Sequence, residues 1–269
     1  MIARDEEPHI ARALASVKDL ADEMIVVDTG SVDRTVAEAR RFGARVYTIP
    51  WTNDFSAARN FALSKARCRW ILVLDADECL SGADRDALRA LVGADERCAY
   101  SLEQRTYLGA SDGFACAPAD ALDEMSRGAA AVFSDRQVRL FRNERAIRYA
   151  CEIHENLEES LLTSGTPIRD AGVAVHHYGR LRDDGRVSRK AILWRALGRE
   201  ALDAYPAHPR YLYELGVQFL AMGELEAAAR HIASALETEP ASWHLWNAMG
   251  LVHLRKGERD QAVSCFKSA

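Results

Sequence analysis

The chain has 269 residues, 48% hydrophobic and 28% charged, which fits a globular protein of one large domain or two smaller ones. Its net charge of -5 gives no general attraction to nucleic acid or to an anionic membrane, and no apolar run approaches the roughly 18 residues of a transmembrane helix. Charged residues near the start exclude a signal peptide, and six scattered cysteines without a C-x-x-C pair argue against a zinc site or a disulfide framework, so we expect a cytoplasmic protein.

The N-terminal part alternates between short apolar strands and amphipathic helices. Residues 1–3 read as the end of a strand whose beginning is absent, and a helix follows with apolar residues at helical spacing, namely Ile10, Leu14, Val17 and Leu20. Residues 24–27 predict a second buried strand and residues 33–43 a second helix, which ends at a glycine. Residues 45–49 predict a third strand.

The most informative segment is residues 70–78, WILVLDADE. Its apolar run stops at acidic residues, which is typical of a strand buried on both faces whose carboxyl end opens on a polar site. A helix at residues 55–66 precedes it, so the order is β-α-β-α-β-α-β. Helical crossovers between strands predict an α/β fold with a mostly parallel sheet and helices on both faces.

Acidic residues follow the predicted first, second and fourth strands: Asp5, Asp28, Asp75 and Asp77. Ligands of open α/β sheets bind at the carboxyl ends of the strands, so we expect one nucleotide-sized pocket there. Asp75 and Asp77 would repel each other without a cation, and Mg²⁺ or Mn²⁺ shared with phosphate oxygens is the natural one. Arg59 is a candidate second phosphate contact, because a guanidinium matches phosphate geometry. The chain has neither the G-x-x-x-x-G-K motif nor the dinucleotide glycine pattern.

Beyond the acidic residues the pattern is less regular. A short helix is predicted at residues 83–92, and β-like runs lie at residues 100–108 and 137–141. Residues 109–135 between them are rich in Gly, Ala, Asp and Ser and predict a long functional or disordered loop. Residues 149–157 and 171–179 each contain a short strand-like run that stops at histidine.

The C-terminal residues contain an internal repeat. Several residues recur at a spacing of 34, among them Gly216 with Gly250, Gly223 with Gly257 and Ala228 with Ala262. Paired helices with this period are typical of tetratricopeptide repeats, and we expect residues 206–269 to form two copies, the second incomplete, in a protein that continues beyond them. Residues 181–205 predict a basic linker helix between the repeats and an N-terminal domain of residues 1–180.

Four segments of the N-terminal part form a combined pattern: IARDEE, VVDTGSVDRT, PWTNDFSAARN and WILVLDADE. Together they resemble glycosyltransferase family 2, whose members have the GT-A fold, a Rossmann-like α/β architecture. Three later segments resemble a bacterial subgroup with C-terminal tetratricopeptide repeats, which includes SunS-type peptide glycosyltransferases and lipopolysaccharide-core enzymes: QVRLFRN, YACEIHENL and VHHYG.

The resemblance implies a metal-dependent, inverting transfer of a sugar from a nucleotide sugar, typically a UDP-sugar, to a glycan, lipid-linked or peptide acceptor. It places Asp28 at the base, Asp5 or Glu6 in the nucleotide pocket, Arg59 near the base and diphosphate, and Asp75 at the ribose. It also implies that Asp77 binds the metal and that His177, from the C-terminal side of the domain, is a second metal ligand. Glu155 is the candidate general base with Glu152 second, and His154 is a further site candidate. The repeats would bind a protein partner or position the acceptor.

Simpler roles remain open for several of these residues. Asp28 could bind only its own turn, Arg59 could pair with Asp54 on the surface, and His176 could replace His177 at the metal. Two other functions also remain open. DADECL resembles the phosphoaspartyl motif of haloacid-dehalogenase phosphatases, with Asp75 as nucleophile, and the chain could be a non-catalytic binding protein with a degenerate transferase domain.

Overall fold

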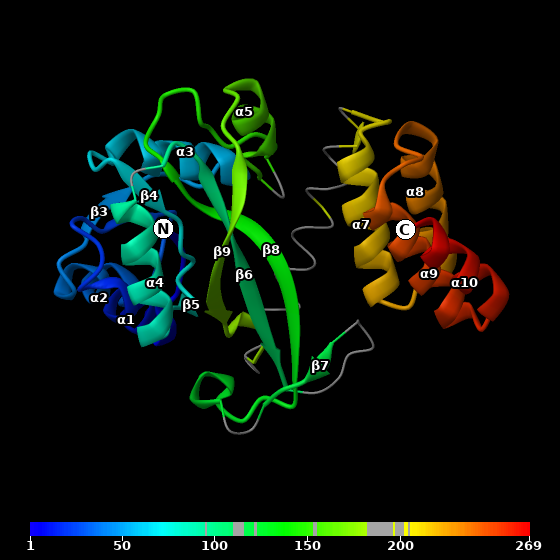
Figure 1. Cartoon of the computed structure of the whole chain (residues 1–269), viewed down its shortest axis with the longest axis horizontal. Coiled ribbons are helices and arrows are strands. Elements are labelled where there is room, and N and C mark those ends of the chain that lie inside the picture. Colours follow the sequence, from blue (N-terminus) through cyan, green and yellow to red (C-terminus); the bar gives the residue numbers. More distant parts are fainter. Residues whose placement is uncertain are drawn as a thin grey trace. The chain divides into compact units, whose positions relative to one another are not determined.

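A computed structural model describes residues 1–94, 96–109, 116–120, 123–152, 155–181, 196, 202–203 and 205–269. The chain divides into two compact units, Met1–Asp184 and Gly185–Ala269 (Figure 1). Most of the expected linker helix lies outside the described residues.

The N-terminal unit begins with a three-stranded parallel sheet. Its strands β1 (Ile2–Ala3), β2 (Ile25–Asp28) and β3 (Arg45–Thr48) are adjacent in that order. The helices α1 (Glu7–Val17) and α2 (Thr35–Arg41) connect them, as predicted. Their apolar faces pack on the sheet in one cluster, which contains Ala3, Ile10, Leu14, Val26 and Ala39. The carboxyl ends of β1 and β2 therefore lie side by side, with Ala3 opposite Asp28.

A second sheet has the order β4-β8-β6-β9-β5, with β7 (Ala117–Pro118) paired to β8. Its strands are β4 (Trp70–Leu72), β5 (Glu78–Cys79), β6 (Ala99–Leu108), β8 (Ala131–Arg142) and β9 (Ile168–His177). The α/β class is confirmed, but here the sheet is mixed. The strand expected to extend the parallel sheet instead pairs antiparallel with β8, Ile71 opposite Phe141. An apolar run buried on both faces shows that it has neighbours but does not specify their direction.

Helices cover both faces of this sheet, as predicted. Leu140 packs in a cluster with residues of α1 and of α4 (Gly82–Gly93). The next residue, Phe141, packs in another cluster with residues of α3 (Phe55–Lys65) and α5 (Glu158–Thr163). Successive strand residues point to opposite faces, so the two clusters lie on opposite sides of the sheet.

Two expectations for this region were wrong in part. The long loop at residues 109–135 contains β7, the 3-10 turn Glu124–Ser126 and the first residues of β8, which is longer than its apolar run at residues 137–141. The first half of β8 is largely exposed and polar, so it lacks an apolar pattern. Residues 149–157 form no strand in their described part, which contains one bridge between Ala150 and Asn156.

From residue 205 on, the described part of the C-terminal unit contains two helix pairs, α7 (Pro209–Ala221) with α8 (Leu225–Thr238) and α9 (Trp243–Lys256) with α10 (Arg259–Ser268). The repeated glycines, Gly216 and Gly250, lie at the contact between the two helices of their pair. A Cβ added to Gly216 would lie 2.6 Å from Ile232, and one added to Gly250 would lie 2.4 Å from Phe266, so both glycines allow close helix packing. The predicted repeat is thus a pair of stacked helical hairpins.

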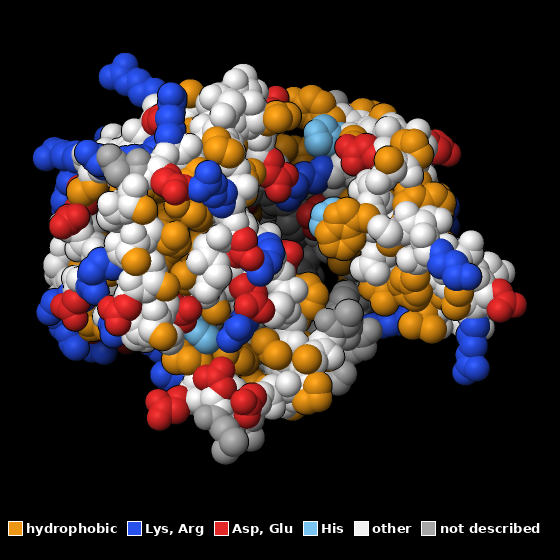
Figure 2. All heavy atoms as spheres, in the orientation of Figure 1, with side chains coloured by type: hydrophobic (Ala, Val, Ile, Leu, Met, Phe, Trp, Pro, Cys, Tyr) orange, Lys and Arg blue, Asp and Glu red, His pale blue; other side chains and the backbone are white. Residues whose placement is uncertain are grey.

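The surface shown in Figure 2 carries acidic and basic side chains interspersed over the N-terminal unit, in keeping with the modest net charge of -5. Among the helices of the described ranges, none combines the length and the apolar character needed to cross a membrane.

Candidate active site

The loops after β1 and β2 are joined by hydrogen bonds. The Asp5 N–H donates to Ser31 Oγ at 2.9 Å, and the Val32 N–H donates to Asp5 Oδ1 at 2.8 Å. The Glu6 N–H donates to Thr35 Oγ1 at 2.7 Å. Asp5 has a positive φ of 54°, a conformation that Asp tolerates better than most residues. Asp5 and Glu6 thus lie beside the loop that begins at Asp28.

Asp28 is buried at the end of β2, with 3% exposure. Its carboxylate accepts hydrogen bonds from the N–H groups of Gly30 and Ser31, each at 3.2 Å. The simpler alternative, an Asp that binds its own turn, is therefore present in the structure. It fixes the turn at the carboxyl end of the strand.

The motif NDFSAARN forms the start of α3 and holds a distant segment in place. Asp54 caps the helix by accepting from the Ala57 N–H at 2.8 Å, so Asp54 is not the partner of Arg59 and that alternative was wrong. The Asn60 side chain donates to Tyr149 O and accepts from the Tyr149 N–H, both at 2.9 Å. These bonds fix the backbone before Glu155 against α3.

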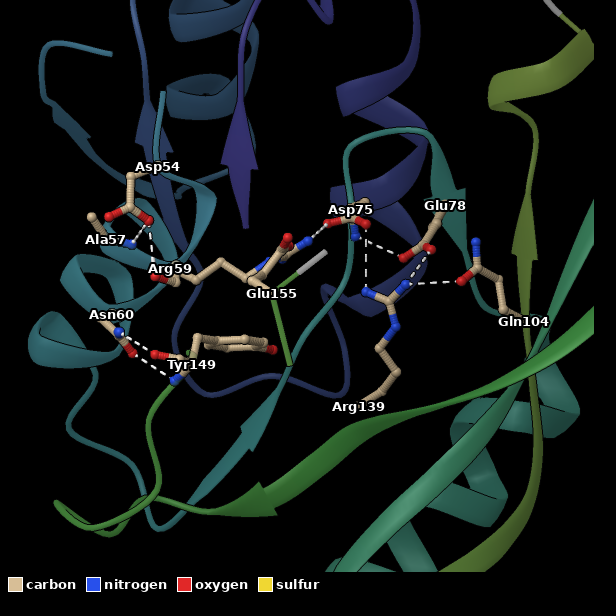
Figure 3. Close-up of polar contacts among 11 residues, drawn as sticks. Asp54, Ala57, Arg59, Asn60, Asp75, Glu78, Gln104, Arg139, Tyr149 and Glu155 are labelled. Carbon is tan, nitrogen blue, oxygen red and sulfur yellow. Dashed lines mark hydrogen bonds and ion pairs between the residues drawn. The ribbon is translucent and has the colours of Figure 1, made fainter. Parts of the chain in front are cut away.

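Arg59 lies between two carboxylates (Figure 3). Its Nη2 is 3.0 Å from Asp75 Oδ1, and its Nε donates to Glu155. The Arg59 and Glu155 side chains are each only 12% exposed. Burial tends to lower the pKa of Arg59, but Asp75 and Glu155 outweigh it and raise that pKa well above its usual value. Arg59 is therefore a fixed cation beside the loop between β4 and β5, which carries Asp75 and Asp77 and is called the acidic loop below.

A second buried arginine, Arg139 of β8, approaches the other oxygen of Asp75, with Nη1 3.5 Å from Oδ2 (Figure 3). Its Nη2 donates to Glu78 Oε1 at 2.8 Å and to Gln104 Oε1 at 3.1 Å. The sequence interpretation missed both Arg139 and Glu78. A charged residue inside the apolar run VRLF is the signal that could have identified Arg139, because a buried charge requires a partner.

Asp77 faces His177 across the β5–β9 pair. His177 Nε2 is 3.4 Å from Asp77 Oδ2, and Nδ1 is 3.0 Å from Thr106 Oγ1. Burial tends to lower the pKa of His177, but Asp77 outweighs it and the pKa is raised. The alternative histidine, His176, points to the other face, where it contacts the Tyr107 hydroxyl at 2.8 Å. His177 is thus the histidine beside Asp77.

Asp77 and His177 offer two donor atoms of the kinds that bind a divalent cation. A Cβ on Gly179 would lie 2.4 Å from Asp77 Oδ2 and 2.6 Å from His177 Nε2, so only glycine fits against these two donors as they stand. A carboxylate and an imidazole suit Mn²⁺, and a carboxylate with phosphate oxygens suits Mg²⁺. Within the described residues, no group of three or more His, Cys, Asp or Glu could hold an ion. Phosphate or water oxygens would have to complete the coordination.

Two of the predicted residues lie beside the acidic loop. Glu155 contacts Arg59, which in turn contacts Asp75, and His177 contacts Asp77. Glu152 is exposed, and its main-chain carbonyl accepts from the Phe55 N–H at 2.8 Å. His154 lies outside the described residues.

The N-terminal region is similar to a known protein family. Residues 1–100 match the family described as glycosyl transferase family 2. A TPR repeat-containing protein of Synechococcus elongatus is 35% identical over 100% of this chain and 64% of its own length. The SPbeta prophage-derived glycosyltransferase SunS of Bacillus subtilis is 24% identical over 88% of this chain and 52% of its own length. The chain thus spans less than two thirds of each of these relatives.

Among solved structures, S. aureus TarS 1–349 in complex with UDP-GlcNAc is 16% identical, covers 99% of this chain and 89% of its own, and superposes with a TM-score of 0.44.

Proposed function

We propose that the chain is a glycosyltransferase (EC 2.4) that moves a hexosyl group from a nucleotide sugar to an acceptor, because residues 1–100 match the glycosyl transferase family 2. The donor in this proposal is a UDP-sugar bound with Mg²⁺ or Mn²⁺, and the reaction inverts the anomeric centre. The acceptor is a glycan, a lipid-linked sugar or a peptide. The observation that carries the proposal is the Asp75–Asp77 loop, where Asp77 faces His177 and Asp75 faces Arg59.

The residues around the loop suit separate parts of the donor. Asp28, with Asp5 and Glu6 in the adjacent loop, would line the pocket of the base, and Asp75 would accept hydrogen bonds from the ribose hydroxyls. Arg59 retains further N–H groups for phosphate oxygens while it holds Asp75. Asp77 and His177 would hold the cation, which supplies neutralisation of the diphosphate as it leaves.

Glu155 is the proposed general base. Its Oε1 accepts from Arg59, so the other oxygen would take the proton of the acceptor nucleophile as that nucleophile attacks C1. The bond from C1 to the diphosphate oxygen breaks on the opposite face, and its electron pair leaves with the diphosphate. Glu152 is the weaker candidate because it is exposed. The helical repeats, in this proposal, bind the acceptor or a protein partner.

The structure disfavours the phosphatase alternative. A phosphoaspartyl nucleophile needs a free carboxylate oxygen aimed at phosphorus. In Asp75 one oxygen faces Arg59 and the other faces Arg139. The degenerate-domain alternative predicts a donor pocket with missing charges, whereas the acidic loop, Arg59 and His177 are all in place.

The test is the Asp77→Asn variant, assayed for UDP-sugar hydrolysis and transfer with Mn²⁺. We expect activity to fall by about 100-fold, because the cation loses a charged ligand. Asp86→Asn is the matched control, since Asp86 is an exposed aspartate nine residues away whose partner is the surface Arg89. Unchanged hydrolysis in Asp77→Asn would exclude the metal role.

A further inference from the structure

Arg139 is a charged residue in the interior of the sheet, with only 4% exposure. The carboxylate of Glu78, with 0% exposure, is its closest partner. Burial raises the pKa of Glu78, and Arg139 opposes that effect. A buried ion pair often adds little stability compared with apolar residues of similar size. Stability alone therefore does not explain why the strand carries an arginine here.

The contacts of this pair lead to Asp75. Glu78 uses one oxygen for Arg139 and the other to accept from the Asp75 N–H at 2.8 Å. Arg139 itself approaches Asp75 Oδ2, and its main-chain carbonyl accepts from the Val73 N–H at 2.8 Å. Arg139 thus contacts both the backbone and the Asp75 side chain of the turn after β4. Figure 3 shows the side-chain contacts of Arg139 with Asp75 and Glu78.

We infer that Arg139 is a positioning residue for the donor nucleotide: it holds the Asp75 carboxylate in a fixed orientation, so that Asp75 meets the ribose and Asp77 is left for the cation. This inference rests on the proposed function. Arg139 acts through Asp75 and Glu78 and is not itself a catalytic residue.

The number of carboxylates explains why Arg59 alone could not hold Asp75 in place. Arg59 already donates to Glu155 through its Nε and to Asp75 through its Nη2. Without Arg139, the carboxylates of Asp75, Glu78 and Glu155 would share that single cation. The repulsion among these carboxylates would be relieved by movement of the Asp75 side chain. Asp75 would then lose the orientation in which it meets the ribose.

The geometry also requires arginine rather than lysine. One guanidinium reaches Asp75, Glu78 and Gln104 from fixed positions on Nη1 and Nη2. A lysine ammonium at the end of a flexible stem cannot reproduce that arrangement. Arg139→Lys is therefore expected to keep the charge compensation and lose most of the orientation.

The experiment measures nucleotide affinity and stability together. The ligand is whichever of UDP, GDP and dTDP binds the wild-type chain most tightly by calorimetry with Mn²⁺. The key variant is Arg139→Met combined with Glu78→Gln, which removes both buried charges and keeps an acceptor for the Asp75 N–H. It should unfold at nearly the wild-type temperature, because no uncompensated charge remains. Its Kd should rise about 10- to 100-fold, as for loss of supporting contacts around a metal site.

Arg136→Met is the matched control, because Arg136 lies on the same strand and pairs with Asp170 at the exposed surface. It should bind the nucleotide like the wild type. A wild-type Kd in the Arg139→Met/Glu78→Gln variant would overturn the inference and leave the proposed function in place. A wild-type chain that binds none of the three nucleotides would overturn the proposed function and this inference with it.

Discussion

At the scale of single residues, two aspartates one position apart have different partners. Asp75 faces Arg59 and Arg139, one guanidinium on each oxygen. Asp77 faces His177, and Gly179 packs closely against both side chains. A carboxylate between two guanidinium groups is held as a hydrogen-bond acceptor, whereas a carboxylate beside an imidazole is suited to a metal. The proposed division of labour between ribose and cation follows from these surroundings.

Gly179→Ala tests the metal side of that division. The added Cβ would lie within 2.6 Å of both donor atoms, so Asp77 or His177 must move. We expect Mn²⁺ affinity in the presence of UDP to fall at least about 10-fold, as for other losses of support around a metal site. Calorimetric titration of Mn²⁺ measures the change.

Gly93→Ala at the end of α4 is its control, because a Cβ there would have no atom within 4 Å. Equal Mn²⁺ affinity in the two variants would contradict the placement of the cation between Asp77 and His177.

At the scale of elements, the N-terminus of α4 is joined to β9 by one carboxylate. Asp84 forms a capping box with Ser81 and accepts from the Ala174 N–H at 2.9 Å. Its Oδ2 is also 3.4 Å from His176 Nε2. Burial tends to raise the pKa of Asp84, but the hydrogen bonds from His176, Ser81 and Ala174 outweigh it and lower that pKa to about 2. The same strand carries His177 to the site, so Asp84 helps to fix its position.

The lowered pKa of Asp84 makes its contribution to stability depend on pH. Stabilisation is complete above the unfolded pKa of about 4 and is lost as the pH falls through the folded value of about 2. Asp84→Asn should therefore cost on the order of 2 kcal/mol at pH 7, and less below pH 4. Urea unfolding at both pH values measures this, with the exposed Asp86→Asn on the same helix as control. An Asp84→Asn loss that is the same at both pH values would show that the ionised carboxylate is not the cause.

The elements themselves were predictable where the pattern is local. The apolar faces of α1 and α2 and the spacing of the repeats depend on residues a few positions apart, and those helices were expected correctly. The direction of β4 and the extent of β8 depend on neighbouring strands. A short buried run does not encode its partner, and the exposed half of β8 has no apolar alternation to reveal it.

At the scale of the whole molecule, the site is assembled from residues far apart in the chain. Arg59 and Glu155 are 96 residues apart, and Glu78 and Arg139 are 61 apart. The family motifs predicted Asp75, Asp77 and His177 as site residues, and the structure places them around one loop. The Arg139–Glu78 pair was missed, because its partners are brought together only by the antiparallel pairing of β8.

The central claim is that this loop binds a nucleotide diphosphate through a divalent cation. The most direct measurement is calorimetric titration of UDP into the wild-type chain, once with Mn²⁺ and once with a chelator. We expect binding at least about 10-fold tighter with Mn²⁺, because Asp77 and His177 would supply metal ligands and the diphosphate oxygens would complete the coordination. The same Kd in both titrations would contradict it.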